Sequence, residues 1–425
     1  MTPTTLGWIR SEGLRMHASL RHRVISLYRP PRPLPCWLHS LWYWLVNHFA
    51  RLEVIAEVEG DCNEASAHLA LLGVKARPLE AVGHLCARVR VRDLETMVTS
   101  GWVRRVWLDR PIEASLDRAI TSTGAVRASR ELTGAGVTIA FVDTGIYPHP
   151  DLRTRLVGWI DLVRGRLNPY DDNGHGTHVA GCAAGDGSSS GGRYRGMAPR
   201  ALLVGVKVLD RLGAGRLSVM LTGIDWVIRN RARYAIRILS LSLGGRAMGH
   251  AADDPLAIAV ERAWQAGLTV VTAAGNSGPE SGTIASPGIA PSVITVGAMD
   301  DRESARRADD VLAPFSSRGP TVEGRVKPDL LAPGVGITSL RAPRSLIDKQ
   351  QPESRVGEWY ATLSGTSMAT PIVAGLVALL LEKEPELEPD GVKARLMETA
   401  EDWGLQPTEQ GAGYLDADGA IWPDG

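Results

Sequence analysis

Three short segments carry a carboxylate, an imidazole and a hydroxyl at widely separated points of the chain. They are Asp143-Thr144-Gly145, Gly174-His175-Gly176-Thr177-His178 and Gly365-Thr366-Ser367-Met368. A serine hydroxyl is a weak nucleophile at neutral pH and needs a neighbouring base to accept its proton. We predict Ser367 as the nucleophile, His178 as the base and Asp143 as the group that orients the imidazole.

A reaction of this kind passes through an intermediate with a negatively charged oxygen, which fixed hydrogen-bond donors must stabilise. Asn276 lies in a turn-like segment, residues 272–278, that contains two alanines and two glycines. The segment resembles the oxyanion segment of the subtilisin-like serine proteases, and this resemblance implies that the Asn276 side chain and the backbone N–H of Ser367 form the oxyanion hole.

Each of these residues also has a structural alternative. Asp143 would serve equally as a cap after a strand, Ser367 as the N-cap of a helix and Asn276 as a turn residue. His175 and His178 have a spacing that suits two metal ligands on one helix, although no third ligand lies nearby in the sequence. The order Asp, His, Ser in one chain favours the catalytic interpretation.

The surrounding sequence alternates between strand and helix patterns. Residues 137–142 form an apolar, β-branched run with Asp143 at its carboxyl end. We expect a helix around residues 217–228, a strand at 236–243, a helix from Pro255 to about Gly267 and a strand at 268–271. This pattern predicts an α/β fold, with a mainly parallel sheet that has helices on both faces.

Helices are also predicted next to two of the reactive groups. We expect His178 to enter a helix that continues through residues 179–181, and Ser367 to precede a buried helix over residues 372–380. Pro371 is compatible with the first turn of that helix, where a missing N–H is tolerated. The segment 364–368 lacks the Gly-x-Ser-x-Gly pattern of α/β-hydrolases.

The chain resembles the subtilisin-like serine proteases, the subtilases of peptidase S8 type, over about two thirds of its length. Besides the triad segments, the similar motifs are His149-Pro150-Asp151-Leu152, Gly196-Met197-Ala198-Pro199, Ser242-Leu243-Gly244-Gly245, Phe315-Ser316-Ser317-Arg318-Gly319-Pro320 and Lys327-Pro328-Asp329-Leu330. The resemblance implies a serine endopeptidase that works through an acyl-enzyme.

The resemblance also implies which residues bind the substrate. Two segments, Ser242, Leu243, Gly244 and Ala273, Ala274, Gly275, correspond to those that flank the primary specificity pocket. An extended peptide would add there as a strand. Small residues on both walls leave room for a large side chain, so we expect a broad, apolar primary specificity.

Calcium is a feature of many subtilases, in which the loop after the catalytic histidine helix supplies oxygen ligands. Here that loop, residues 186–195, has one carboxylate and two arginines. Calcium prefers six to eight oxygen ligands that include carboxylates. We therefore assign no metal ligands and expect no cofactor in the chemistry, while a structural calcium elsewhere stays open. The loop is more similar to that of bacterial subtilases without a conventional signal peptide.

The N-terminal part of the chain is predicted to be a separate small α+β unit, of ferredoxin-like type, over residues 51–113. Strands are expected at 52–58, 84–91 and 103–108, and helices at 64–72 and 93–100. In subtilases such a unit is an inhibitor and folding chaperone, so the resemblance implies a self-processing zymogen whose own prodomain is a partner. Residues 114–125 would be the processing linker and 126–425 the catalytic domain. An unrelated regulatory or docking domain is the alternative.

Residues 1–50 form an N-terminal extension that is basic and then rich in tryptophan. The apolar stretch 36–50 is too short and too polar to span a membrane. We expect a helix that packs on protein, although contact with a membrane is the other option. No secretory signal is recognisable, which favours a cytoplasmic location over secretion by an unrecognised signal.

Composition excludes some function classes. The 425 residues include 47 Lys and Arg against 47 Asp and Glu, so no overall field attracts nucleic acid. The partners expected are therefore protein or peptide substrates, with an oligomeric state that the sequence leaves open. Two rival functions remain: a peptide ligase or cyclase, which product masses would distinguish, and a peptide-binding protein without catalysis.

Overall fold

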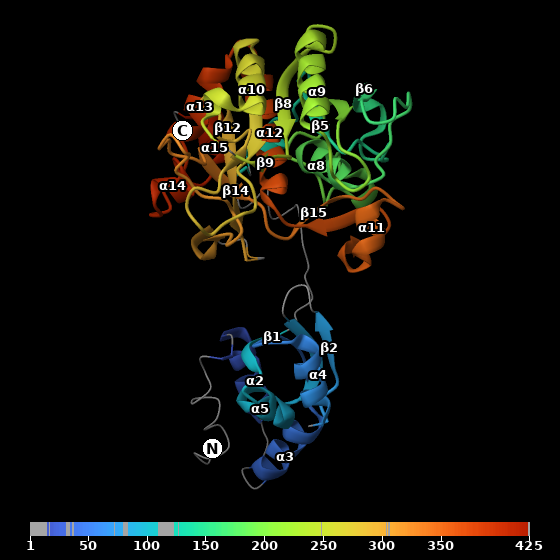
Figure 1. The fold of residues 1–425 in the computed structure, drawn as a ribbon, viewed down its shortest axis with the longest axis vertical. Helices are drawn as coiled ribbons and strands as arrows, with labels where there is room; N and C mark the ends of the chain where they lie inside the picture. The colour runs from blue at the N-terminus through green and yellow to red at the C-terminus, as the bar shows by residue number, and fades with distance from the viewer. Residues whose placement is uncertain are drawn as a thin grey trace. The chain divides into compact units, whose positions relative to one another are not determined.

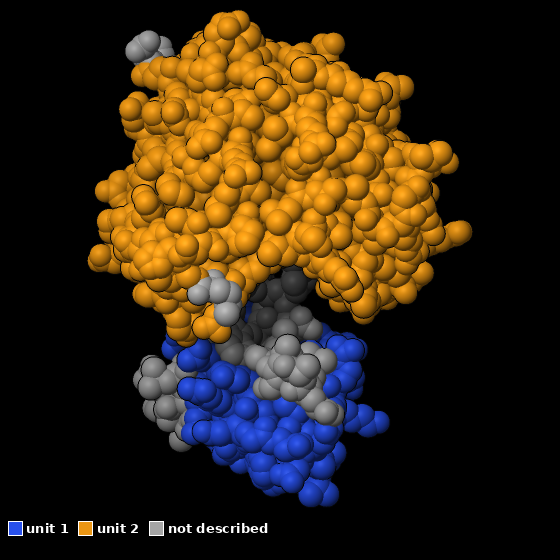
Figure 2. Space-filling model, turned by 45° about the horizontal axis from the view of Figure 1, so that its top comes forward, with its two compact units in different colours: residues 1–112 blue, residues 113–425 orange. Residues whose placement is uncertain are grey.

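The structure is a computed structural model, and it describes residues 15–16, 18–30, 35, 38–71, 73–79, 84–108, 123–125, 127–247, 249–302, 304 and 307–423. Two compact units make up the chain, residues 1–112 and residues 113–425 (Figure 2). Each unit has its own hydrophobic core. The predicted processing linker, residues 114–125, lies outside the described residues except for 123–125.

The N-terminal unit contains one four-stranded antiparallel sheet in the order β2-β3-β1-β4 (Figure 1). After the helices α2 (Ala18–Tyr28) and α3 (His39–Phe49), the elements are β1 (Arg51–Val58), α4 (Cys62–Leu71), β2 (Ala76–Leu79), β3 (His84–Arg90), α5 (Val91–Thr99) and β4 (Val103–Leu108). The sequence predicted five of these six elements. It did not predict β2, a four-residue strand at the edge of the sheet that contains Pro78.

The described residues among the first fifty belong to the core of this unit rather than to a separate extension, so the predicted boundary at residue 50 is wrong. Met16, Leu20 and Val24 are buried in the same cluster as the strand residues of β1, β3 and β4. The backbone N–H of Val106 in β4 also donates to the carbonyl of Arg15, at 2.8 Å. Alternating residues of the strands leave an apolar face, and α2 helps to cover it.

The C-terminal unit is built on an eight-stranded sheet. Its order is β13-β12-β10-β8-β5-β7-β6, with β14 paired to β12, and β13 is its antiparallel strand. The strands of this sheet are β5 (Thr138–Asp143), β6 (Leu156–Asp161), β7 (Leu202–Lys207), β8 (Ile236–Leu241), β10 (Thr269–Ala273), β12 (Ile294–Asp300), β13 (Val311–Leu312) and β14 (Leu330–Pro333). The predicted mainly parallel sheet is therefore present.

Helices cover both faces of this sheet (Figure 1). The helices of this unit are α7 (Ala128–Glu131), α8 (His175–Ala184), α9 (Leu217–Asn230), α10 (Pro255–Gln265), α11 (Leu346–Gln350), α12 (Thr366–Lys383), α13 (Pro389–Glu398), α14 (Pro407–Gln410) and α15 (Ala417–Ile421), and α8, α9, α10 and α12 pack on the sheet. Val142 lies against α9, where a Cβ on Gly223 would be 3.5 Å from its Cγ1. The next residue, Asp143, contacts α8. Successive strand residues point to opposite faces, so α9 and α8 lie on opposite sides.

Short strands complete the unit. β9 (Gly245–Arg246) pairs with β11 (Ala285–Ser286), and β15 (Ile337–Leu340), β16 (Arg355–Val356) and β17 (Tyr360–Leu363) form a three-stranded antiparallel sheet. Among the described residues, α12 is the one helix long and apolar enough to cross a membrane. However, 83% of its 18-residue window is buried inside the unit, as in a core helix.

Candidate active site

Three neighbouring strands bring the predicted polar residues to one edge of the large sheet. β10, β8 and β5 are adjacent and parallel, so their carboxyl ends meet at the same edge. Asp143 is the last residue of β5, Ser242 follows β8, and Asn276 lies three residues beyond β10. Open α/β sheets bind their ligands at such an edge.

The Asp143 carboxylate holds a histidine, and that histidine is His175. The Nδ1 atom of His175 lies 2.8 Å from Oδ1 and 3.0 Å from Oδ2 of Asp143. The backbone N–H of Thr144 also donates to Oδ1, at 2.6 Å. With Nδ1 bound to the carboxylate, Nε2 of His175 is left as the atom that can accept a proton.

The start of α8 explains why this histidine reaches the strand end. Gly174 caps the helix in a left-handed conformation, with φ of 108°, and His175 is its first residue. A Cβ atom on Gly176 would lie 2.2 Å from the carbonyl oxygen of Gly145 and 3.0 Å from Asp143 Oδ1. Only glycine at position 176 lets the helix approach the strand this closely.

His178 does not contact Asp143, and the prediction that it is the base is wrong. It lies almost one turn further along α8 and is 1% exposed. Its Nε2 lies 3.0 Å from the carbonyl oxygen of Ala361 and 3.1 Å from that of Ile337. Both partners are acceptors, so Nε2 carries the proton and Nδ1 faces the Cys182 thiol, at 3.6 Å. Both nitrogens are therefore committed to internal contacts.

The pKa values of the two imidazoles are also shifted in opposite directions. Burial lowers the pKa of His178 to about 3, although its carbonyl partners oppose that shift. For His175 burial also acts downward, but the charge and hydrogen bond of Asp143 outweigh it and raise the pKa above the ordinary value. The side chain of His175 is 23% exposed, so it can meet a ligand. Only His175 is both accessible and suited to accept a proton near neutral pH.

Ser367 is the second residue of α12, and it is tied to the same sheet edge. Its hydroxyl donates to the carbonyl oxygen of Ser242, at 3.1 Å, and the Ser242 hydroxyl donates to the carbonyl oxygen of Ser367, at 2.9 Å. Gly365 is the N-cap of α12, so Ser367 lies inside the helix rather than capping it. Pro371 lies in the second turn of α12.

The orientation of the Asn276 amide follows from its bonds to the residue before Ser367. Its Oδ1 accepts hydrogen bonds from the backbone N–H of Thr366, at 2.9 Å, and from the Thr366 hydroxyl, at 3.0 Å. The amide nitrogen therefore points elsewhere, and the residue is exposed. The N–H of Ser367 lies in the first turn of α12, where N–H groups have no helical acceptor. The Asn276 amide and the Ser367 N–H thus both lie at the start of α12.

The six predicted substrate-binding residues differ in exposure. Gly244 is exposed and Gly275 is half-buried, so their backbone is accessible. The side chains of the other four, Ser242, Leu243, Ala273 and Ala274, are buried. The structure therefore allows contact with a ligand mainly through backbone at the two glycines.

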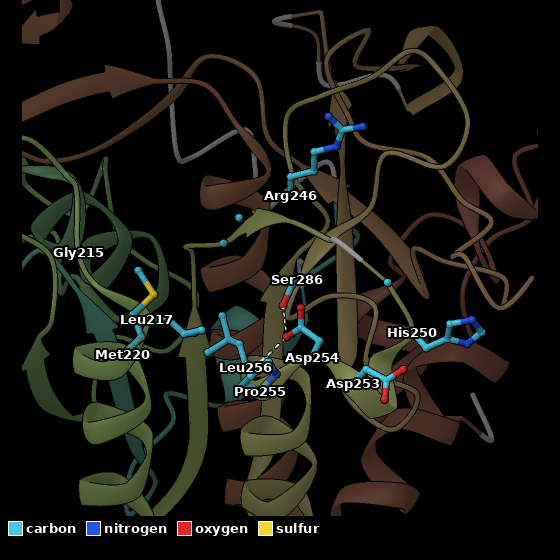
Figure 3. Close-up of a pocket in the computed structure, with 13 residues that line it drawn as sticks. Gly215, Leu217, Met220, Arg246, His250, Asp253, Asp254, Pro255, Leu256 and Ser286 are labelled. Atoms are coloured by element: carbon cyan, nitrogen blue, oxygen red, sulfur yellow. Dashed lines mark hydrogen bonds between the residues drawn. The ribbon is translucent and has the colours of Figure 1, made fainter.

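A pocket of 510 Å³ opens beside this segment (Figure 3). Leu217 and Met220 from the start of α9 face Leu256 from α10 (Figure 3). Gly244 and Gly245 also line the pocket. The Asp254 carboxylate at its base is already engaged by the N–H groups of Leu256 and Ala257 and by the Ser286 hydroxyl. Since the Asp254 carboxylate already has its partners, Leu217, Met220 and Leu256 offer a ligand mainly apolar contact.

The loop after α8 does not fit a calcium ion at Asp151. This buried carboxylate accepts hydrogen bonds from the N–H of Ser189 at 2.9 Å, the hydroxyl of Ser188 at 3.2 Å and the hydroxyl of Tyr360 at 2.6 Å. Burial raises the pKa of Asp151, but these donors outweigh it and lower the pKa. A cation cannot occupy a position to which donors point. Among the described residues, no three His, Cys, Asp or Glu side chains gather as metal ligands.

The sequence contained a signal that identifies His175. Glycines flank this histidine on both sides, which indicates close approach of the backbone at position 175. His178 is followed by Val179 and Ala180, which are buried core residues. His178 lies about 60° around α8 from His175 and about 4.5 Å further along the helix, where its ring contacts Ile337 and Ala361 rather than Asp143.

Comparisons with known proteins identify the family of this chain. Residues 134–415 match the peptidase S8 family, described as the subtilase family. The chain is 46% identical to the serine protease AprX of Bacillus subtilis (strain 168), over 97% of both proteins. It is 36% identical to subtilisin Savinase of Lederbergia lenta, over 69% of this chain and 93% of that protein.

A solved structure described as a cold adapted subtilisin-like serine proteinase also matches. The TM-score is 0.52 and the identity 33%, over 67% of this chain and 89% of that one. These findings confirm the resemblance that the sequence motifs indicated. The chain therefore belongs to the subtilase family of serine-type endopeptidases.

Proposed function

We propose that this chain hydrolyses peptide bonds through Asp143, His175 and Ser367, with Asn276 as an oxyanion donor. The observation that carries the proposal is the bond between Asp143 and His175 at the sheet edge to which Ser242 also ties Ser367. His175 replaces His178 in the role that we first predicted, because only His175 pairs with the carboxylate.

The reaction begins when the Ser367 hydroxyl turns from the Ser242 carbonyl toward the substrate. His175 Nε2 accepts the hydroxyl proton while Oγ forms a bond to the peptide carbonyl carbon. Asp143 stabilises the imidazolium that results. The Asn276 amide and the Ser367 N–H donate to the oxygen that becomes negative. His175 then gives its proton to the leaving amine, and water releases the acyl group by the reverse sequence.

The substrate is an extended peptide that lies along the exposed backbone at Gly244 and Gly275. Hydrogen bonds to the main chain of an extended peptide do not depend on its sequence, so the pockets for its side chains determine which sequences are cleaved. Leu217, Met220 and Leu256 favour an apolar side chain in the pocket beside this groove. A broad cleavage pattern with apolar preference follows.

The N-terminal unit acts as a prodomain that is removed by self-cleavage. Its element order, β-α-β-β-α-β, and its sheet order support a ferredoxin-like topology. The unit has its own core, as an inhibitor that folds ahead of its enzyme requires. Cleavage takes place in the segment that joins it to the C-terminal unit.

Covalent labelling combined with product analysis tests the proposed chemistry. A fluorophosphonate probe should modify Ser367 in the wild-type chain, and the Ser367→Ala variant should neither label nor hydrolyse casein. Peptide products should differ from their substrates by one water, whereas a ligase would join fragments without water. Casein hydrolysis by purified Ser367→Ala protein would refute the assignment.

A further inference from the structure

Helix α3 of the N-terminal unit presents a continuous apolar stripe to solvent. Leu41, Trp44, Leu45 and Phe49 are 52%, 50%, 38% and 67% exposed. At about 100° per residue, these positions cover an arc of about 140° on one side of the helix. The one other residue within this arc is His48, whose ring stacks on Trp44 at 4.6 Å. We call these four apolar residues the α3 stripe.

The opposite side of α3 already makes the contacts that hold the helix in the unit. Val46 is buried in the core, and the indole N–H of Trp42 donates to the carbonyl of Leu27, at 3.1 Å. The hydroxyl of Tyr28 at the end of α2 bonds to the Asn47 side chain. The α3 stripe is therefore surplus to the packing of its own unit.

Three arginines near the α3 stripe have no acidic partner among the described residues, although Glu95 on the neighbouring helix α5 lies close enough to Tyr28 to raise its pKa. No Asp or Glu occurs between Gly13 and Leu52 in the sequence. Arg23, Arg29 and Arg51 are exposed, and none of them makes an ion pair with a described residue. Arg51 lies two residues beyond Phe49, and Arg29 follows the end of α2 that contacts α3. Arg23 is about 9 Å of helix rise further back along α2.

We propose that the α3 stripe and these three arginines dock the N-terminal unit on the surface of a bilayer that contains anionic lipids. Aromatic and aliphatic side chains on one side of a short helix, with arginines around it, suit the boundary between headgroups and acyl chains. Eleven residues are about 16 Å long, which is too short to span a bilayer, so α3 lies in the plane of the surface.

Charge favours a lipid surface over a second copy of this chain. A symmetric dimer through the α3 stripe would bring Arg29 and Arg51 of one copy close to the same arginines of the other. Like charges at such an interface oppose association. Anionic headgroups instead supply counter-charges to Arg23, Arg29 and Arg51, which make no ion pair with a described residue, at depths that the arginine side chains reach.

Vesicle sedimentation with the full chain tests this proposal, and the Ser367→Ala variant keeps both units in one polypeptide. The protein should sediment with vesicles of phosphatidylcholine and phosphatidylserine, and not with phosphatidylcholine alone. The double variant Trp44→Ser/Phe49→Ser should lower the partition coefficient about tenfold or more. High salt, near 1 M, should weaken binding because it shortens the screening length to about 3 Å.

Matched control variants distinguish binding through the α3 stripe from nonspecific hydrophobic or electrostatic binding elsewhere on the unit. Leu71 is 86% exposed on α4, outside the α3 stripe, so Leu71→Ser should leave vesicle binding unchanged. Lys75→Gln removes one exposed charge elsewhere on the unit, and it should weaken binding less than Arg51→Gln. Because every altered side chain is exposed, these variants are expected to fold normally, which circular dichroism checks.

Three results would overturn the proposal. The first is the absence of sedimentation with the anionic vesicles. The second is equal binding by Trp44→Ser/Phe49→Ser and Leu71→Ser. The third is a dimer in light scattering that the double variant converts to monomer without any change in vesicle binding, which would assign the α3 stripe to a second copy.

Discussion

The two histidines of α8 lie three residues apart and have opposite environments. His175 meets a carboxylate and solvent, whereas His178 meets two carbonyls and a thiol inside the protein. The start of α8 decides which histidine meets Asp143, because a helix that began one residue earlier or later would turn each side chain by about 100°.

Substitution of each histidine should give contrasting kinetics. His175→Ala should lower kcat about 10⁶-fold, because the nucleophile loses the base that accepts its proton. His178→Gln keeps a donor near the two carbonyls and should retain kcat within a few-fold at neutral pH. Initial rates on a chromogenic peptide measure both. A larger loss in His178→Gln than in His175→Ala would reverse our assignment.

His178 should also make the fold sensitive to acid. Its pKa is about 3 in the folded protein, well below the ordinary value of 6.5, so between these values the unfolded chain binds a proton that the folded chain does not. Stability is therefore lost as the pH falls, by about 2 kcal/mol between pH 7 and pH 5 from this side chain. Urea unfolding at both pH values measures the effect.

His178→Gln removes that titrating group, so its loss of stability over the same pH range should be smaller by about the same 2 kcal/mol. An unchanged pH dependence in His178→Gln would show that other groups cause the acid sensitivity.

At the scale of elements, the contact between β5 and α8 depends on one glycine. In Gly176→Ala the added Cβ would overlap the Gly145 carbonyl and crowd Asp143, so the start of the helix must move. We expect a loss of about 1–3 kcal/mol in stability, together with a loss of kcat as His175 shifts. Thermal unfolding and initial rates provide the measurements.

The matched control is Gly391→Ala in α13. There a Cβ would be closest, at 2.8 Å, to the terminal carbon of the Leu387 side chain, which can move. Helix propensity alone predicts a gain of about 0.5–1 kcal/mol. If Gly176→Ala and Gly391→Ala changed the stability by the same amount, the close contact at Gly176 would not contribute to the stability of the fold.

The loop after α8 and the strand β17 are joined by Tyr360 and Asp151. Tyr360→Phe should lower the free energy of unfolding by about 1.5–3 kcal/mol, because a buried carboxylate loses a donor. Tyr194→Phe is the control, since the Tyr194 ring packs on Tyr360 but its hydroxyl makes no hydrogen bond within the described residues.

Hydrogen-bond donors surround Asp151, so no calcium ion should bind at this loop. A calcium chelator should therefore not lower the Tm of the wild-type protein by removing calcium from this loop. A drop in Tm on addition of chelator that is restored by calcium, and that the Asp186→Asn variant does not show, would contradict our description of the loop.

Sequence patterns predicted the elements that have strong periodicity. The helix 217–228 and the strands near 137–142, 236–243 and 268–271 are present as α9, β5, β8 and β10, and Asp254 caps α10 as its sequence suggests. The patterns did not predict the short edge strand β2 or the helix α2. β2 has only four residues, one of them a proline, and three consecutive basic residues at 21–23 interrupt the apolar pattern of α2.

The site could be predicted in type but not in full detail. Asp143 follows from the end of a buried strand, and Asn276 and Ser367 follow from family motifs. The choice between His175 and His178 depends on where α8 begins, and helix ends are the least certain feature of a sequence pattern. The reciprocal bonds between Ser242 and Ser367 join residues 125 positions apart, which no local pattern indicates.

At the scale of the whole molecule, self-processing should depend on the same hydroxyl as hydrolysis. We expect the wild-type chain to convert from 45.6 kDa to a smaller form, by cleavage between the units, while Ser367→Ala stays intact. Denaturing gel electrophoresis over time, with N-terminal sequencing, measures this. Cleavage of purified Ser367→Ala at the same position would point to another protease.

The shared core of the N-terminal unit decides where its gene can be shortened. An expression clone that starts at Arg51 would keep the whole four-stranded sheet yet omit Met16, Leu20, Val24 and Tyr28, all of which are buried in the intact unit. The truncated protein would expose the apolar surface of β4 that α2 covers, and it should aggregate or fold poorly. Workers who wish to supply the unit in trans should therefore begin the clone ahead of Arg15.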